Sequence, residues 1–266
     1  MSLNFGAIAP HPPIIVSGIG ESGDLEKTAD TIVGMRRLTT AFNEADVDTL
    51  IIISPHGLVY PNSFNICQMQ KLFGTFASFG QPDVMVEAEN NLDFVDLLGK
   101  KMDESEIAYS FYDNDGEFFE LDHGAMVPLT FLKQNQESSF KVVPITYSNL
   151  DTETHFAFGG AIREAAKDYA GRVGILASGD LSHQLLQNPD GKKFDQKLTT
   201  DLENYKVENI TQYDEDFIAS AGECGYRSIL ILLGALKGLE VHPKILSYQG
   251  PFGVGYLVAN FELPEA

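Results

Sequence analysis

The sequence predicts an α/β fold with one central sheet, mostly parallel or mixed, flanked by helices on both faces. Short apolar runs alternate along the chain with longer segments of helical periodicity, the pattern of a sheet covered by helices. The clearest run is Leu50–Ile53 (LIII), which is too short and too β-branched to favour a helix. At 266 residues, a single domain over 1–266 can bury such a core.

The first elements predict a βαβ unit. Asn4–Ala9 is a short strand that ends at the three prolines of the PHPP stretch, 10–13, because proline excludes both a helix and a central strand. Asp24–Ala45 carries its apolar residues mainly on one helical face. Strands joined through a helix run parallel, so their carboxyl ends meet at one edge of the sheet. We therefore expect His11 and His56, which follow these two strands, on the same side of the sheet.

The remaining elements continue the alternation of strand and helix. We expect further strands at 64–70, 84–89, 140–147, 173–177, 244–248 and 254–261. We expect further helices at 92–102, 126–132, 152–169, 194–205, 214–219 and 228–239. The segment 109–120 is rich in Asp, Asn, Gly and aromatic residues, which predicts a long functional loop or a lid.

Composition narrows the classes of partner. The net charge of −20 comes from 38 acidic and 18 basic residues, and such a surface repels phosphate backbones and anionic lipid, so we expect neither nucleic acid nor a membrane as partner. The amino terminus lacks the features of a signal peptide. Only two cysteines are present, Cys67 and Cys224, which indicates no disulfide framework and fits a cytoplasmic protein.

Four of the six histidines lie at the ends of elements, in motifs dense with Pro, Gly, Ser and Asp: His11, His56, His123 and His183. The other two, His155 within a helix and His242 before a proline, are interpreted as structural. No CxxC pair, Walker loop, GxGxxG or GxSxG motif is present, which argues against a zinc finger, a nucleotide site and a serine hydrolase.

Two histidines and one carboxylate form the facial triad of non-haem Fe(II) oxygenases, which leaves positions open for substrate and O₂. His11 and His56 are the natural pair, and the candidate carboxylates are Glu223, Asp122 and Asp180. Glu223 is favoured because it stands in a tight glycine-flanked turn where a helix starts. Asp122 and Asp180 each precede a histidine, so they either orient imidazoles as hydrogen-bond acceptors or serve as helix-cap and turn residues.

Five motifs, in this order, carry a family resemblance: PHPP with His11, SPHG with His56, LDHGAMVPL with His123, SGDLSHQ with His183, and the closing GPFGVGY. Together they resemble the class III extradiol ring-cleavage dioxygenases, in the superfamily of the catalytic LigB-like subunit. That superfamily also holds zinc-dependent relatives of the plant-type DOPA dioxygenases and the Memo-like proteins. The resemblance spans nearly the whole chain.

The resemblance implies a catalytic site. His11, His56 and Glu223 would hold Fe(II), with zinc as the alternative occupant. The substrate would be a small catechol-type aromatic that reacts with O₂. His183 would be the acid/base that exchanges a proton with a substrate hydroxyl, and His123 would hydrogen-bond the substrate. Aromatic side chains of 109–120 would then cover the ring.

One departure concerns the third metal ligand. Cys224-Gly225-Tyr226-Arg227 also resembles the Memo-like pattern, in which a cysteine takes that place. Glu223 and Cys224 are neighbours, so only one of them can point at the metal, and a thiolate is softer than a carboxylate. The leading function is thus an Fe(II)-dependent dioxygenase. The alternatives are a Memo-like metal-binding or regulatory protein and a zinc-bound relative without ring cleavage. A homo-oligomer and a small partner subunit both stay open.

Overall fold

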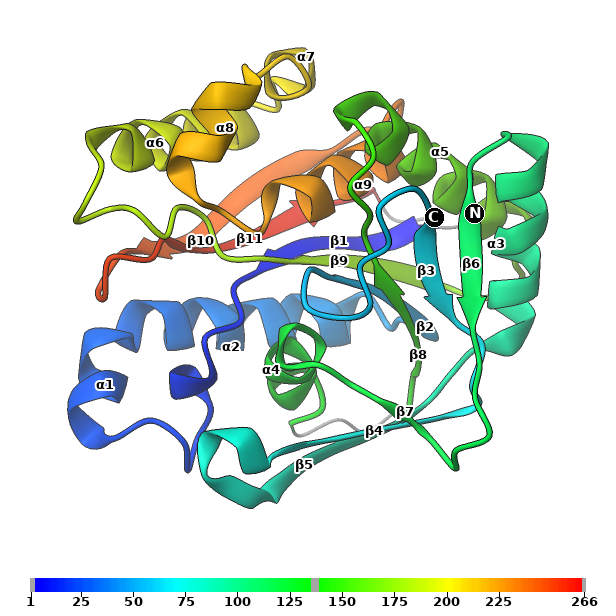
Figure 1. The fold of residues 1–266 in the computed structure, drawn as a ribbon, viewed down its shortest axis with the longest axis horizontal. Helices are drawn as coiled ribbons and strands as arrows, with labels where there is room; N and C mark the ends of the chain where they lie inside the picture. Colours follow the sequence, from blue (N-terminus) through cyan, green and yellow to red (C-terminus); the bar gives the residue numbers. More distant parts are fainter. Residues whose placement is uncertain (1–2, 135–138, 265–266) are drawn as a thin grey trace.

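The computed structural model describes residues 3–134 and 139–264, and its centre is a mixed eight-stranded sheet in the order β10-β11-β1-β9-β2-β8-β3-β6 (Figure 1). A three-stranded sheet, in the order β5-β4-β7, lies beside it. The strands are β1 (Leu3–Ala9), β2 (Thr49–Ser54), β3 (Phe64–Cys67), β4 (Lys71–Phe76), β5 (Gln81–Glu89), β6 (Tyr109–Tyr112), β7 (Phe119–Glu120), β8 (Lys141–Thr146), β9 (Val173–Ser178), β10 (His242–Gln249) and β11 (Tyr256–Glu262).

Strand direction at the centre of the large sheet decides where the histidines lie. β1 and β2 both run parallel to β9, which lies between them, and β2 also runs parallel to β8. The carboxyl ends of β1, β9 and β2 therefore meet at one edge, as the βαβ prediction required. In open α/β sheets this edge is where ligands bind.

Helices cover both faces of the large sheet, which confirms the predicted fold class (Figure 1). In Figure 1, α2 and α4 lie on one side of the sheet and α3, α5 and α9 on the other. The helices are α1 (Ser22–Lys27), α2 (Ala29–Glu44), α3 (Leu92–Glu104), α4 (His123–Leu132), α5 (Thr152–Asp168), α6 (Pro189–Glu203), α7 (Val207–Ile210), α8 (Glu215–Ala221) and α9 (Tyr226–Leu236), with short 3₁₀ turns η1 (Pro13–Ile15) and η2 (Ala77–Phe79).

β2 shows why its sequence is apolar throughout. Its residues alternate between two cores: Ile51 and Ile53 pack with α3, α5 and α9, whereas Leu50 and Ile52 pack with α2 and α4. All four side chains are fully buried. A strand covered on both faces has no polar side, which is why its sequence lacks the polar alternation of a surface strand.

The predicted strand 64–70 is wrong in its second half. β3 ends at Cys67, and a separate strand, β4, begins at Lys71 and belongs to the small sheet. The Asn90 side-chain amide holds the turn between them, because it donates to the carbonyls of Cys67 and Met69 at 2.9 and 3.0 Å. This turn depends on a residue 21 to 23 positions away along the chain, so the local pattern did not reveal it.

The segment 109–120, expected as a loop or lid, begins and ends with strands β6 and β7. Within the described part of the chain, its ring contacts are to itself and to β4: Tyr112 with Phe119, and Phe118 with Phe73 at 5.0 Å between ring centroids. No ring pair in the described residues joins this segment to the histidines, so the structure does not support the expectation that its rings cover the substrate.

Candidate metal centre

His11, His56 and His123 meet at the edge where β1 and β2 end and α4 begins. One ring nitrogen of each lies within 4.8 Å of those of the other two. The Nε2 atoms of His11 and His56 are 3.0 Å apart, and the rings of His56 and His123 stack with centroids 4.2 Å apart. His11 is buried, His123 is half-buried and His56 is exposed, so the group reaches from the core to solvent.

The glycine after His56 and the one after His123 allow this close approach. A Cβ on Gly57 would lie 2.2 Å from Thr146 Oγ1, and a Cβ on Gly124 would lie 2.4 Å from Ser54 Oγ. Neither distance is tolerated by real side chains unless a neighbour shifts. Gly57 therefore lets the chain after β2 pass close to the end of β8, and Gly124 brings the start of α4 against the end of β2. The glycine that follows each of these two histidines is thus needed for the close packing around the histidine group.

Ser178 orients His11, and sequence reasoning did not single it out. Its hydroxyl donates to the Gly124 carbonyl at 2.5 Å and lies 2.9 Å from His11 Nδ1. Because the hydroxyl proton is engaged with the carbonyl, Ser178 accepts from Nδ1–H of His11, which leaves the lone pair on Nε2, the atom that faces His56. A small polar residue at the last position of a buried strand, just before the GD of SGDLSH, was the available signal.

The site keeps its imidazoles neutral. Burial lowers the pKa of His11 well below its usual value, and the neighbouring His56, His123 and His183 lower it further. Burial also lowers the pKa of His56 and of His123, with Asp122 acting in the opposite direction on both. Metals bind neutral imidazole, so burial favours the form of these side chains that ligation needs.

Asp122 caps a helix, whereas Asp180 contacts both the backbone and the ring of His11, with Oδ2 4.0 Å from His11 Nε2. Asp122 is the N-cap of α4, where it accepts from the Ala125 amide at 3.2 Å and from the Ser54 hydroxyl at 2.5 Å. Asp180 accepts from the His11 backbone amide at 3.0 Å, and burial raises its pKa to about 7. Of the two roles open from the sequence, the structure shows the helix cap for Asp122, and for Asp180 it shows contacts with the backbone and with the ring of His11.

The turn before α9 separates Glu223 from Cys224. The Glu223 carboxylate accepts from the Tyr226 amide at 2.5 Å and lines a cavity of about 530 Å³ that also contains Arg227. Cys224 Sγ lies 3.6 Å from His11 Nε2 and accepts from the Asp180 amide at 3.3 Å. Of the two candidate third ligands, the structure thus brings Cys224, and not Glu223, to the histidines.

His183 also lies beside Cys224, with Nε2 3.9 Å from its Sγ. Its backbone amide donates to Ala221 at 3.1 Å, and burial, followed by the charge of His56, lowers its pKa. The two histidines interpreted as structural lie elsewhere: His155 is buried in α5 against Phe64, and the exposed His242 faces Glu240.

The donor set fits a metal ion. Zinc-bound imidazole nitrogens lie about 2.0–2.1 Å from the ion, so two of them in a tetrahedral site would be about 3.3–3.4 Å apart. The His11 and His56 Nε2 atoms, now 3.0 Å apart at hydrogen-bond distance, would have to separate by only a few tenths of an ångström to bind an ion. Imidazole suits zinc, iron and copper, and a nearby thiol adds a softer donor.

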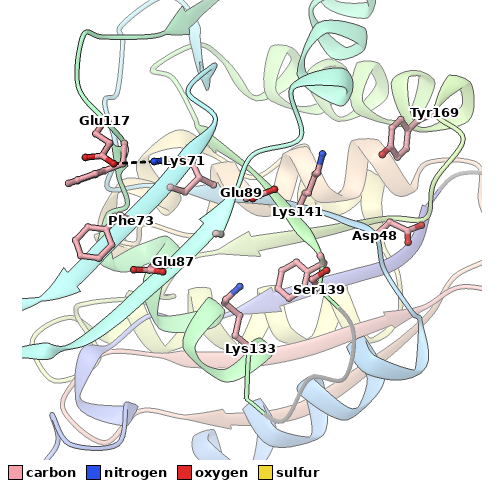
Figure 2. Close-up of a pocket in the computed structure, with 14 residues that line it drawn as sticks. Asp48, Lys71, Phe73, Glu87, Glu89, Glu117, Lys133, Ser139, Lys141 and Tyr169 are labelled. Atoms are coloured by element: carbon pink, nitrogen blue, oxygen red, sulfur yellow. Dashed lines mark hydrogen bonds and ion pairs between the residues drawn. The ribbon is translucent and has the colours of Figure 1, made fainter.

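A second cavity, of about 920 Å³, lies between the small sheet and the starts of β2 and β8 (Figure 2). Figure 2 shows positively charged lysines and negatively charged Asp and Glu side chains around it. Lys71 is paired with Glu117 at 3.0 Å. Its lining residues, all in the described part of the chain, include no histidine. This cavity is therefore separate from the candidate metal centre.

Known protein families and relatives match the part of the chain that contains these histidines. A family model described as the catalytic LigB subunit of aromatic ring-opening dioxygenase matches residues 6–259. The protein CA_C1420 of Clostridium acetobutylicum is 34% identical over 98% of this chain, which spans 58% of that relative's length. A MEMO1 family protein of Methanococcus maripaludis is 28% identical over 93% of this chain and 77% of its own.

A third relative is named 3,4-dihydroxyphenylacetate 2,3-dioxygenase, from Escherichia coli, and is 28% identical over 69% of this chain and 64% of its own. A crystal structure of an uncharacterised Escherichia coli K12 protein has the same fold, with a TM-score of 0.65 and 15% identity over 97% of this chain and 99% of that one. On the family match over most of its length, the chain belongs to the family of the catalytic LigB subunit of aromatic ring-opening dioxygenases, with relatives among the MEMO1 proteins.

Proposed function

We propose that this chain binds a divalent metal, Fe(II) in the active form, and opens the ring of a catechol-type substrate with O₂. The observation that carries the proposal is the 3.0 Å approach of His11 Nε2 to His56 Nε2 at the carboxyl edge of the sheet. His11 and His56 are the first two ligands, and Cys224 or His123 supplies the third. Zinc is the alternative occupant of the same donors.

A bound Fe(II) would supply Lewis acidity and an electron-transfer route between the catechol and O₂. His183, which burial keeps neutral, accepts a proton from a substrate hydroxyl and later returns one to the ring-opened product. His123, whose ring stacks on His56, hydrogen-bonds the substrate when it is not itself a ligand. Membership of the LigB family and the relative named for a dihydroxylated aromatic support this substrate class.

A second candidate is a Memo-like metal-binding or regulatory protein without ring cleavage. The observation that favours it is the position of Cys224, 3.6 Å from His11 Nε2, where a carboxylate would complete the facial triad. A thiolate ligand suits copper or zinc better than it suits an oxygenase iron, and MEMO1 family proteins are among the relatives.

The test is anaerobic loading of the protein with Fe(II) or Zn(II), followed by O₂ and a panel of catechols. An Fe(II)-dependent uptake of O₂ with a yellow ring-opened product would support the dioxygenase. Tight metal binding without O₂ uptake on any catechol would reject it in favour of the second candidate.

A further inference from the structure

Phe79 presents an aromatic ring beside the candidate metal centre. Its ring centroid is 5.5 Å from that of His123, with the planes 62° apart, and the residue is 40% exposed. A single exposed phenylalanine is ordinary on a protein surface. This one borders a group of neutral imidazoles that also reaches solvent, so its free face is available to whatever approaches those histidines.

The position of Phe79 is held by its own segment. Phe79 ends η2, the 3₁₀ turn in the connection between β4 and β5. Gly80 closes the turn with φ +80°, and its backbone amide donates a hydrogen bond to the Ala77 carbonyl at 2.9 Å. Because glycine adopts a positive φ without strain, Gly80 allows the chain to turn back from η2 into β5. Behind it, the fully buried ring of Phe76 lies 6.1 Å from the Phe79 ring.

The rings form a row that runs from Phe79 to the ligand nitrogens. Phe79 meets His123 edge-on at 5.5 Å, and His123 stacks on His56 at 4.2 Å. A planar molecule that binds at His56 on the side of His123 therefore lies next to this row. Aromatic pairs at such spacings are stabilised beyond the area they bury.

We propose that Phe79 is the apolar wall of the substrate site and selects ligands with a flat aromatic ring over saturated cyclic diols of similar size. The inference rests on the proposed function and assigns to Phe79 the contact with the ring that the 109–120 segment does not make. Phe79 contacts substrate and takes no part in proton or electron transfer.

The experiment measures binding of 4-nitrocatechol and of cis-1,2-cyclohexanediol to the metal-loaded protein under anaerobic conditions. Phe79→Ala is compared with Phe79→Tyr and with Phe118→Ala. Phe118 is a matched control, because it is 41% exposed and packs edge-on against Phe73 at 5.0 Å, away from the histidines. Metal content is measured on every variant, so that loss of the metal is not mistaken for loss of the ring contact.

The expected result is about tenfold weaker binding of 4-nitrocatechol to Phe79→Ala, no comparable change in Phe79→Tyr or Phe118→Ala, and no effect of Phe79→Ala on the saturated diol. Unchanged nitrocatechol binding in Phe79→Ala would overturn the inference and leave the proposed function standing. Equal loss for both ligands would also overturn it, since the side chain would then not select a ring. If metal-loaded wild type binds no catechol, the proposed function fails and the inference fails with it.

Discussion

At the scale of single residues, Ser178 decides which nitrogen of His11 faces the other donors. It bridges the end of β9 and the start of α4 through its bonds to His11 Nδ1 and the Gly124 carbonyl. Partners that orient a metal-binding histidine typically contribute 10- to 100-fold to metal affinity. The orientation of His11 thus depends on a hydroxyl that makes no contact with the metal itself.

We expect Ser178→Ala to weaken metal binding by about 10- to 100-fold, because His11 Nδ1 loses its acceptor. Equilibrium titration with Zn(II) and Fe(II) measures this directly. Ser228→Ala is the matched control: Ser228 is also fully buried, but among the described residues its hydroxyl has no hydrogen-bond partner. Equal affinities for the two variants would contradict the role assigned to Ser178.

The choice between Glu223 and Cys224 is also made residue by residue. Glu223→Gln should leave the metal content unchanged, because the Glu223 carboxylate already accepts a hydrogen bond from the Tyr226 amide. Cys224→Ser should weaken the binding of zinc more than that of Fe(II), because a hydroxyl is a harder ligand than a thiolate. Metal analysis after dialysis against a chelator distinguishes them. Loss of metal from Glu223→Gln with full retention in Cys224→Ser would restore the carboxylate as third ligand.

At the scale of elements, the start of α4 couples helix stability to the site. Its N-cap, Asp122, accepts both the Ala125 amide and the Ser54 hydroxyl and so joins the helix to the end of β2. α5 has a comparable N-cap, Asp151, which accepts the Thr154 amide at 2.8 Å but lies outside the histidine group. Comparing a loss of the N-cap in each helix therefore distinguishes the general effect of losing a cap from an effect on the histidine group.

Asp122→Ala and Asp151→Ala should each lower the free energy of unfolding by about 0.5–2 kcal/mol, as loss of an N-cap does. Only Asp122→Ala should also weaken metal binding, because His123 is the first residue of α4. Chemical denaturation and metal titration of both variants provide the check. A similar loss of metal affinity in Asp151→Ala would show that general destabilisation, and not the α4 cap, controls the site.

The order and direction of the elements determined which parts of the site could be predicted from the sequence. The parallel strands and the motifs at their ends were enough to place His11 and His56 together, because strand direction follows from the βαβ connection. Glu223 and Cys224 could not be separated in this way, since neighbouring side chains diverge according to the turn, here one with Gly222 at φ +58°. Phe79 was missed because its position depends on how the small sheet packs on α4, which no local pattern contains.

At the scale of the whole molecule, buried carboxyls make stability depend on pH. Asp195 accepts the Ser182 amide at 2.8 Å and the Tyr248 hydroxyl at 2.7 Å, and so ties α6 to the segment that carries His183 and to β10. Burial raises the pKa of Asp195 to about 6, against the lowering effect of these two bonds. The folded protein therefore holds this proton at a pH where the unfolded chain, with a carboxyl pKa near 4, has lost it.

A raised folded-state pKa contributes stability that is full below about pH 4 and is lost as pH rises through about 6. Asp195→Asn should reduce the fall in unfolding free energy between these values by about 2–3 kcal/mol. Tyr248→Phe, which removes a bond that lowers the pKa, should move the fall to higher pH. Denaturation across pH 4–8 measures both, and a profile unchanged in Asp195→Asn would refute the assignment.

No helix in residues 3–134 and 139–264 combines the length and apolar character needed to cross a membrane. Within this fold, the carboxyl edge of the large sheet gathers ring nitrogens, a thiol and an exposed aromatic ring from β1, β2, β9, α4, η2 and the turn before α9. The proposed chemistry requires that this edge bind a metal ion, and the rest of the account depends on that step.

The most direct measurement is the stoichiometry and affinity of Fe(II) and Zn(II) binding to wild type and to the His11→Ala/His56→Ala double variant under anaerobic conditions. We predict one tightly bound ion per wild-type chain and loss of that ion in the folded double variant. Circular dichroism confirms that the variant is folded. Wild-type protein that binds no divalent metal, or a double variant that binds it with wild-type affinity, would contradict the account.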